Sequence, residues 1–272
     1  MKLAISNIAW DPNEDEAVFK LMRKHGFSGL EVAPGRVFEK PFEASAGDIS
    51  KFVSGLLLYG IRPVAMQALL FGRPDLKIFG PAETRIQTLE YLKNMISFAE
   101  RLGISPLVFG SPKNRDSAGM DKNAAATIAL DFFGEIGRFA SAHGAKLCIE
   151  PNPAAYGTDF INTTREAAYF VKKVNDSGFA LHIDTGAIIM NGEEPDSSAG
   201  AFASMAAHVH ISAPGLDPVL NDARRGTHEK ISLALKKSDY AGWGSIEMKK
   251  PGASGRLETI EKALSFVREI YG

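Results

Sequence analysis

The chain has 272 residues, which is long enough for one large domain with a sizeable core. Lys and Arg (31) nearly balance Asp and Glu (32), so the net charge of −1 gives no general attraction to nucleic acid, whose binding depends on clustered cations. The longest apolar runs, 54–59 and 65–71, are too short to span a membrane. The N-terminus has no signal-peptide features and Cys148 is the only cysteine, so we expect a cytoplasmic protein without internal disulfides.

Short apolar strands alternate with helical patterns along the whole chain. The strands are predicted near residues 2–6, 28–33, 61–67, 105–110, 145–150, 179–184, 208–212 and 243–247. Apolar residues at helical spacing predict helices over 15–24, 84–102, 123–142 and 257–270. This alternation is typical of parallel βαβ units, and eight such units in a chain of this length indicate an α/β fold, a (β/α)8 barrel. We expect a single domain over residues 1–272.

Two details bear on this fold prediction. A glycine precedes five of the strands, and each fits the position after a helix where a left-handed conformation is needed: Gly26, Gly60, Gly103, Gly144 and Gly178. The main alternative is an open doubly wound sheet, which usually carries a phosphate-binding glycine loop after its first strand. The segment 6–10 follows the first strand here and contains no glycine.

Four of the later strands end in residues that bind metals: Glu150, Asp184, His210 and Glu247. A single carboxylate at a strand end is explained equally well as a helix N-cap. Four residues at equivalent places on consecutive strands instead favour a shared metal site, because the C-terminal strand ends of a barrel converge at one mouth. Three carboxylates and one imidazole suit Mn²⁺, Mg²⁺ or Co²⁺ at least as well as Zn²⁺.

The residues two positions earlier face the same way along each strand. Cys148, His182, His208 and Ser245 are therefore expected in a layer beneath the four ligands. We expect them to orient the ligands by hydrogen bonding, with His208 as a supporting residue and His182 also close enough to meet substrate. Histidines that are simply hydrogen-bonded in the core remain an equal alternative.

The ordered set of Glu150, Asp184, His210 and Glu247 resembles the ligand set of the xylose isomerase-like superfamily of metal-dependent barrels. The set is most similar to that of the sugar isomerase and epimerase group, which includes the ketose 3-epimerases, and the resemblance covers nearly the whole chain. It implies a divalent metal held by these four residues and a sugar substrate. It also implies that Glu150 and Glu247 act as the acid/base pair that moves a proton beside the substrate carbonyl, through an enediolate.

The sequence departs from this family around the metal. Members commonly carry a substrate-binding histidine three residues after the strand-6 aspartate, where this chain has Ala187, and a substrate-binding glutamate near the position of Tyr156. Basic residues occupy the loops instead, and those taken as candidate substrate contacts are Lys113, Arg115, Arg225 and Lys249. They predict an anionic sugar, a phosphate or an acid, although charged loops are also ordinary.

Other functions remain open. A lyase or dehydratase acting on a keto-inositol or a 3-keto-glycoside would use the same metal and the same proton abstraction. An apurinic endonuclease is less favoured, since its additional metal-binding histidines correspond here to Gln67, Ser111 and Ala187. The oligomeric state is left open, a homo-oligomer included, and no nucleic-acid or membrane partner is expected.

Overall fold

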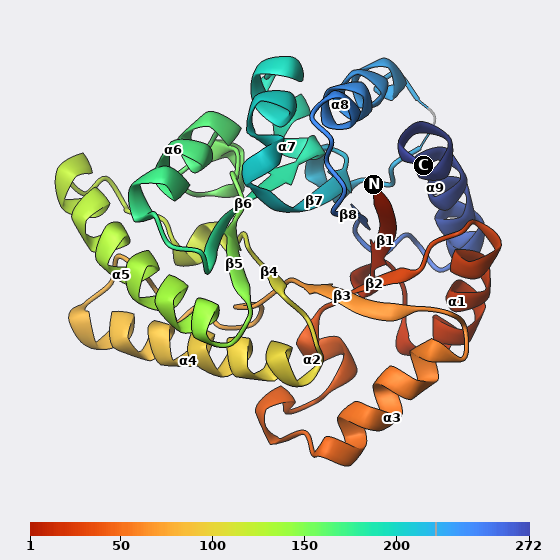
Figure 1. Ribbon diagram of the computed structural model, residues 1–272, viewed down its shortest axis with the longest axis horizontal. Helices are drawn as coiled ribbons and strands as arrows, with labels where there is room; N and C mark the ends of the chain where they lie inside the picture. Colours follow the sequence, from red (N-terminus) through yellow and green to blue (C-terminus); the bar gives the residue numbers. More distant parts are fainter. Residues whose placement is uncertain (221) are drawn as a thin grey trace.

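The computed structural model describes residues 1–220 and 222–272. Within these residues, eight parallel strands close into a barrel in the order β1 to β8, and helices surround it (Figure 1). The predicted (β/α)8 fold is therefore confirmed. The strands are β1 (Lys2–Ser6), β2 (Gly29–Val32), β3 (Arg62–Met66), β4 (Pro106–Phe109), β5 (Lys146–Ile149), β6 (Phe179–Asp184), β7 (Ala206–Ser212) and β8 (Trp243–Glu247).

The long helices lie close to their predicted bounds, because their apolar residues repeat at helical spacing and pack on the barrel. The helices are α1 (Asp15–Lys24), α2 (Pro34–Val37), α3 (Ala46–Leu57), α4 (Ala82–Arg101), α5 (Lys122–Ala142), α6 (Thr164–Val174), α7 (Thr185–Asn191), α8 (Arg225–Lys237) and α9 (Arg256–Tyr271). Capping boxes start α3 at Ser45 and α6 at Thr163, where a hydroxyl accepts from the backbone and an acidic side chain reaches back.

Four of the five glycines have the predicted role, and one does not. Gly26, Gly60, Gly103 and Gly144 have φ between 66° and 73°, as expected after a helix. The left-handed residue after α6 is Asn175 instead, with φ of 50°. The fifth glycine is Gly178. A Cβ there would collide with the backbone of α5, so this glycine is required by close packing and not by its φ.

Strand register sets the height of the polar residues inside the barrel. Parallel pairing places His182 of β6 beside His208 of β7, and Asp184 beside His210. On the other side of β7, His210 is paired with Ser245 of β8. The polar side chains of these strands therefore lie in adjacent layers at the C-terminal end of the barrel, above a largely aliphatic core.

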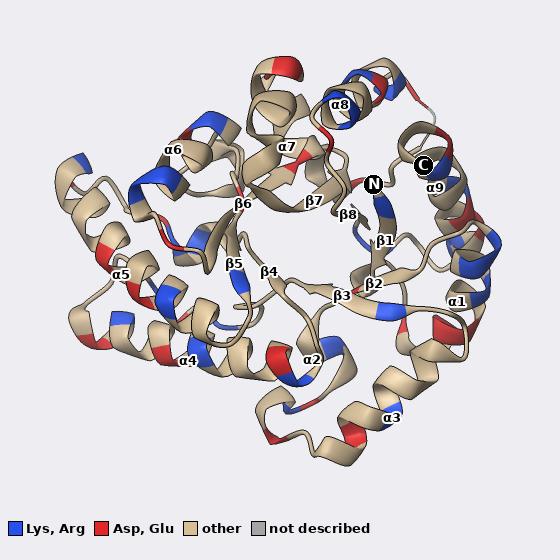
Figure 2. Cartoon of the chain, in the orientation of Figure 1, with Lys and Arg blue, Asp and Glu red and all other residues tan. Residues whose placement is uncertain are grey.

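The outer helices carry basic and acidic side chains interspersed with one another, as Figure 2 shows. This distribution agrees with the balanced composition. None of the described helices combines the length and the apolar character needed to cross a bilayer.

Candidate metal centre

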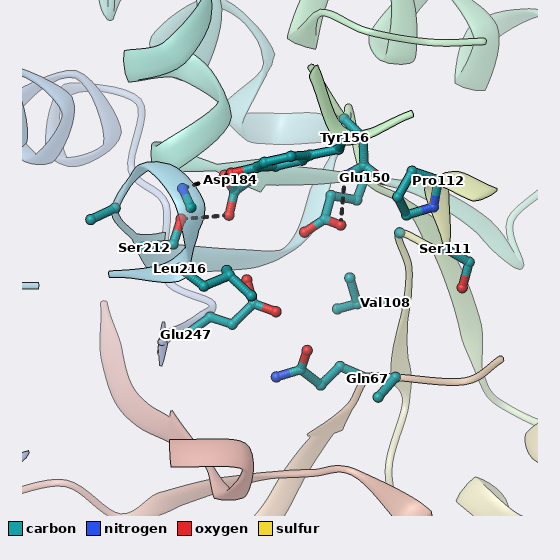
Figure 3. A pocket seen from close by; sticks show the side chains of 15 residues that line it. Gln67, Val108, Ser111, Pro112, Glu150, Tyr156, Asp184, Ser212, Leu216 and Glu247 are labelled. Atoms are coloured by element: carbon teal, nitrogen blue, oxygen red, sulfur yellow. Dashed lines mark hydrogen bonds between the residues drawn. The ribbon is translucent and has the colours of Figure 1, made fainter. Parts of the chain in front are cut away.

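The four residues predicted to bind metal come together at the mouth of the barrel, and Figure 3 shows three of them, Glu150, Asp184 and Glu247. Glu150 follows β5 directly, Asp184 and Glu247 end β6 and β8, and His210 lies within β7. His210 Nδ1 is 3.2 Å from Glu150 Oε1, 3.2 Å from Glu247 Oε2 and 3.9 Å from Asp184 Oδ2. The three carboxylates line a cavity of about 400 Å³. One imidazole nitrogen is therefore faced by three carboxylates from three other strands.

A fifth residue, Glu31 of β2, supports this arrangement from below. Its Oε1 lies 2.9 Å from His210 Nε2 and 3.3 Å from His208 Nε2, while Ser245 Oγ donates to its Oε2 at 2.7 Å. Its side chain is fully buried. Because Glu31 accepts from Nε2, it turns Nδ1 of His210 toward the three carboxylates.

The sequence contains a signal for Glu31 that the prediction did not use. The strand Gly29–Val32 is buried at every position, and Glu31 is the one charged residue in it. A buried charge is costly unless it is paired, so a lone glutamate in such a strand indicates an interior partner.

The layer beneath the ligands is polar, as predicted, but its members differ in what they contact. His208 is near Glu31, and His182 Nε2 lies 3.6 Å from Glu150 Oε1. Among the described residues, neither ring of this pair has a partner with hydrogen-bond geometry. The thiol of Cys148 donates to the Lys146 carbonyl at 3.3 Å and so does not orient a ligand.

Local structure holds Asp184 in place. Asp184 is the N-cap of α7, and its Oδ1 accepts from the Ala187 N–H at 2.5 Å. Its Oδ2 accepts from Ser212 Oγ at 2.6 Å. Asp184 is thus a helix N-cap as well as a candidate metal ligand. The two explanations of a carboxylate at a strand end do not exclude each other at this position.

Glu150 is held both at its backbone and at its carboxylate. Arg115, which is fully buried, donates from Nη2 to the Glu150 carbonyl at 2.5 Å, and Asn152 Nδ2 donates to Glu150 Oε2 at 2.9 Å. A Cβ at Gly110 would collide with Glu150 Oε2. The absence of a side chain at Gly110 therefore leaves room for the carboxylate.

Burial and mutual proximity shift the ionisation of these groups. Burial, followed by the charges of Glu150 and Glu247, raises the pKa of Asp184 to about 7. Burial also raises the pKa of Glu247, with Glu150 and Glu31 adding to this rise and His210 opposing it. Three crowded carboxylates in a buried site favour a bound cation over their joint ionisation without one.

The pKa values of Glu31 and His210 are shifted in the direction that favours their charged forms. Burial lowers the pKa of His210, but Glu247 and Glu31 outweigh burial and hold it well above its usual value. Burial raises the pKa of Glu31, but His210 and His208 outweigh burial and hold it well below. Glu31 and His210 therefore form a buried ion pair when Nδ1 carries a proton.

This donor set fits a divalent metal. Three carboxylate oxygens and one imidazole nitrogen come from separate strands, and the other nitrogen of the imidazole is held by a carboxylate. Glu150, His182, Asp184 and His210 also each offer a ligand atom within 4.8 Å of the others. Oxygen-rich donors of this kind suit Mn²⁺, Mg²⁺ or Co²⁺, and Zn²⁺ also accepts them.

The basic residues proposed as substrate contacts lie elsewhere. Lys113 and Arg115 are absent from the lining of the cavity, and so is Arg225, whose guanidinium pairs with Glu229 at 2.8 Å and Glu269 at 2.5 Å. Lys249 lies near the mouth but pairs with Asp217 at 2.6 Å. None of these four basic residues lines the metal-site cavity, so the expectation of an anionic substrate gains no support from the lining of this cavity.

Other residues form the wall of the cavity. Tyr156 lies over Asp184 in Figure 3, and its hydroxyl accepts from the Gly215 N–H at 2.9 Å, which joins the β5 and β7 loops. Leu216 lies beside Glu247, and the amide of Gln67 points toward Glu247 (Figure 3). The sequence marked Tyr156 as a departure from the family, whereas Leu216 carried no signal in the sequence.

Comparisons with known proteins agree with this fold. The chain is 26% identical to an inosose dehydratase from Clostridium beijerinckii over 166 residues, which are 53% of this chain and 54% of that relative. It thus spans about half the length of this curated relative. The structure resembles a D-psicose 3-epimerase from Clostridium cellulolyticum H10 solved with D-tagatose, with a TM-score of 0.82, 16% identity, and coverage of 100% of this chain and 99% of that one.

A second solved structure, the IOLI protein with a bound zinc atom, has a TM-score of 0.76 and 18% identity, and covers 100% of this chain and 98% of its own. The model of the xylose isomerase-like TIM barrel family matches residues 19–270. The chain belongs to the xylose isomerase-like TIM barrel family.

Proposed function

We propose that this protein is a divalent-metal-dependent isomerase or epimerase of a sugar. The observation that carries the proposal is the position of His210 Nδ1, which faces Glu150, Asp184 and Glu247 at the lining of one cavity. The names of its relatives support a sugar-related substrate, since they include an epimerase solved with a ketose and an inosose dehydratase.

The four proposed ligands are Glu150, Asp184, His210 and Glu247. A metal bound by them would act as a Lewis acid that polarises the substrate carbonyl and lowers the energy of the enediolate. Metal binding requires that His210 lose its Nδ1 proton, while its Nε2–H continues to donate to Glu31.

Glu150 and Glu247 are proposed to move the proton. Both carboxylates line the cavity and approach it from strands β5 and β8. One carboxylate oxygen takes the proton from the carbon beside the carbonyl, and the other carboxylate returns a proton. Return to the opposite face of the same carbon epimerises it, and return to the neighbouring carbon interconverts aldose and ketose. Asn152, which donates to Glu150 Oε2, fixes the direction of that carboxylate.

Dehydration of a keto-inositol is a second candidate, favoured by the match to the inosose dehydratase over about half of each chain. The first step would be the same proton abstraction. The enediolate would then expel a hydroxyl from the next carbon, so water would leave and the product would be lighter than the substrate. The two functions therefore differ in product mass.

The test uses Mn²⁺-loaded protein in D₂O with neutral ketoses, their phosphates and keto-inositols, and reads the products by NMR and mass spectrometry. We expect one solvent deuteron at a single carbon and no loss of water from the substrate. Glu150→Gln and Glu247→Gln should each lower turnover by about 100-fold or more, because each removes a proton carrier. Glu135→Gln, on the outside of α5, is the matched control and should retain turnover.

Loss of water from a keto-inositol would select the dehydratase instead. Turnover that survives both Glu150→Gln and Glu247→Gln would overturn the proposed mechanism. A clear preference for the phosphorylated ketoses would restore the expectation of an anionic substrate.

A further inference from the structure

A second cavity, called here the side groove, lies next to the candidate metal centre. Its volume is about 730 Å³, and it shares Gln67, Ala68, Leu216 and Glu247 with the metal-site cavity. The metal-site cavity lies over the ends of β4 to β8, and the side groove extends it across β1 to β3. The metal-site cavity alone is large enough for one sugar ring. The two cavities together could therefore hold a larger molecule.

The loops around the mouth favour a substrate that extends from the metal-site cavity toward β1 to β3. On the β5 and β7 side, the hydrogen bond between Tyr156 and the Gly215 N–H joins two loops beside the cavity. On the other side, Gln67 and Leu216 line both cavities, so the two cavities adjoin there. A substituent on a sugar held at Glu247 would therefore reach the side groove.

The walls of the side groove are mostly apolar and aromatic. They include Ile8, Leu69, Phe71, Tyr91 and Met95. Phe71 is 89% exposed, although its neighbours Leu69 and Leu70 are buried and anchor the loop. An anchored loop thus presents an aromatic ring at the rim of the groove, where an apolar or ring-shaped group would cover it.

The charges of the side groove are balanced. Arg36 pairs with Asp15 at 2.5 Å, and Arg73 pairs with Asp75 at 2.7 Å. The other two basic residues of the groove are Lys249, which pairs with Asp217, and Lys250, which pairs with Asp11. A phosphate or carboxylate would have to compete with these acids, whereas an uncharged ring would not.

We propose that the side groove binds an uncharged ring joined to the reacting sugar, so that a glycoside is preferred as substrate over a free sugar. This rests on the proposed function. It also constrains the chemistry, because the anomeric carbon of a glycoside is held in an acetal. The carbonyl beside the abstracted proton must then lie on another carbon of the sugar ring.

The test measures binding separately from turnover. Isothermal titration calorimetry on Mn²⁺-loaded protein compares phenyl β-D-glucopyranoside with methyl β-D-glucopyranoside, neither of which carries a ketone. We expect the phenyl glycoside to bind about tenfold more tightly or better, from apolar and aromatic contact in the groove. Phe71→Ala should lower the affinity for the phenyl glycoside toward that of the methyl glycoside. Leu58→Ala, which removes another exposed apolar side chain, should keep the preference.

Equal affinity for the two glycosides, or no binding of either, overturns the side groove as a ring-binding site. Tighter binding of 4-carboxyphenyl β-D-glucopyranoside than of the phenyl compound overturns the uncharged occupant. Failure of deuterium incorporation with every sugar, while the phenyl preference persists, would refute the proposed function and leave the ring-binding site standing. Deuterium incorporation into free ketoses without any preference for the phenyl glycoside would support the proposed function and refute the ring-binding site.

Discussion

Single residues decide how the candidate ligands are oriented. Glu31 is buried among His208, His210 and Ser245, and it accepts from the nitrogen of His210 that faces away from the carboxylates. A carboxylate in this position fixes the tautomer and ring orientation of a ligating histidine, and raises its basicity. Glu31 is therefore expected to act through His210 and not on the substrate.

The first prediction follows from that contact. Glu31→Gln should weaken Mn²⁺ binding by roughly 10- to 100-fold, because the amide keeps the size of the side chain but removes the charge that holds His210. Calorimetric titration of the metal-free protein measures this directly. The exposed exchange Glu135→Gln is the control and should leave the dissociation constant unchanged. An unaltered affinity in Glu31→Gln, with the fold intact by circular dichroism, would contradict the orienting role.

At the scale of elements, a histidine outside the candidate metal centre, His228, joins α8 to α9. His228 is buried at the start of α8, and its Nδ1 lies 2.8 Å from the hydroxyl of Tyr271 at the end of α9. Burial, helped by Arg224 and opposed by Asp222, lowers the pKa of His228 to about 4. The folded protein thus keeps this imidazole neutral over a range in which the unfolded chain protonates it.

The second prediction concerns acid stability. Since the pKa of His228 is about 4 in the folded protein and about 6.5 in an unfolded chain, its contribution is complete above pH 6.5 and is lost as the pH falls toward 4. The loss amounts to up to about 3 kcal/mol of unfolding free energy at 1.36 kcal/mol per pKa unit. Urea unfolding of the chelator-treated protein at pH 7 and pH 4.5 should show a smaller acid loss for His228→Gln than for the unchanged chain. Equal losses would refute this assignment.

The whole molecule places the reactive groups at one end of a closed barrel and commits three carboxylates to one buried cavity. Such a barrel without a cation holds like charges together, and burial together with these neighbouring charges raises the pKa values of Asp184 and Glu247. Anything that binds the folded state and not the unfolded one stabilises the fold. A bound metal is therefore expected to raise the free energy of unfolding.

The third prediction is that Mn²⁺ at 100 times its dissociation constant stabilises the fold by about 2.7 kcal/mol. For a chain of this size, that corresponds to a rise in Tm of roughly 5 °C, measured by differential scanning calorimetry. Excess chelator should reverse the rise. Glu150→Gln should lose most of it and Glu135→Gln should keep it, whereas an equal rise in both variants would place the metal elsewhere.

The sequence by itself determined the barrel and the four candidate ligands. Both depend on local patterns: strand, loop and helix repeat along the chain, and Glu150, Asp184, His210 and Glu247 each stand at or near the end of a strand. Parallel strands that close in order bring their ends together, so their convergence needed no knowledge of side-chain packing.

Only the tertiary structure decided what surrounds the four ligands. Glu31 meets His210 because β2 and β7 lie across the interior of one barrel, a contact between residues far apart in the sequence. Lys249 is paired with Asp217 and lines the side groove, and Arg225 of α8 is paired with Glu269, so neither lines the metal-site cavity. The side groove is formed by residues at the ends of five strands, β1, β2, β3, β7 and β8, and by α4. Its shape depends on long-range packing, which no local pattern of residues records.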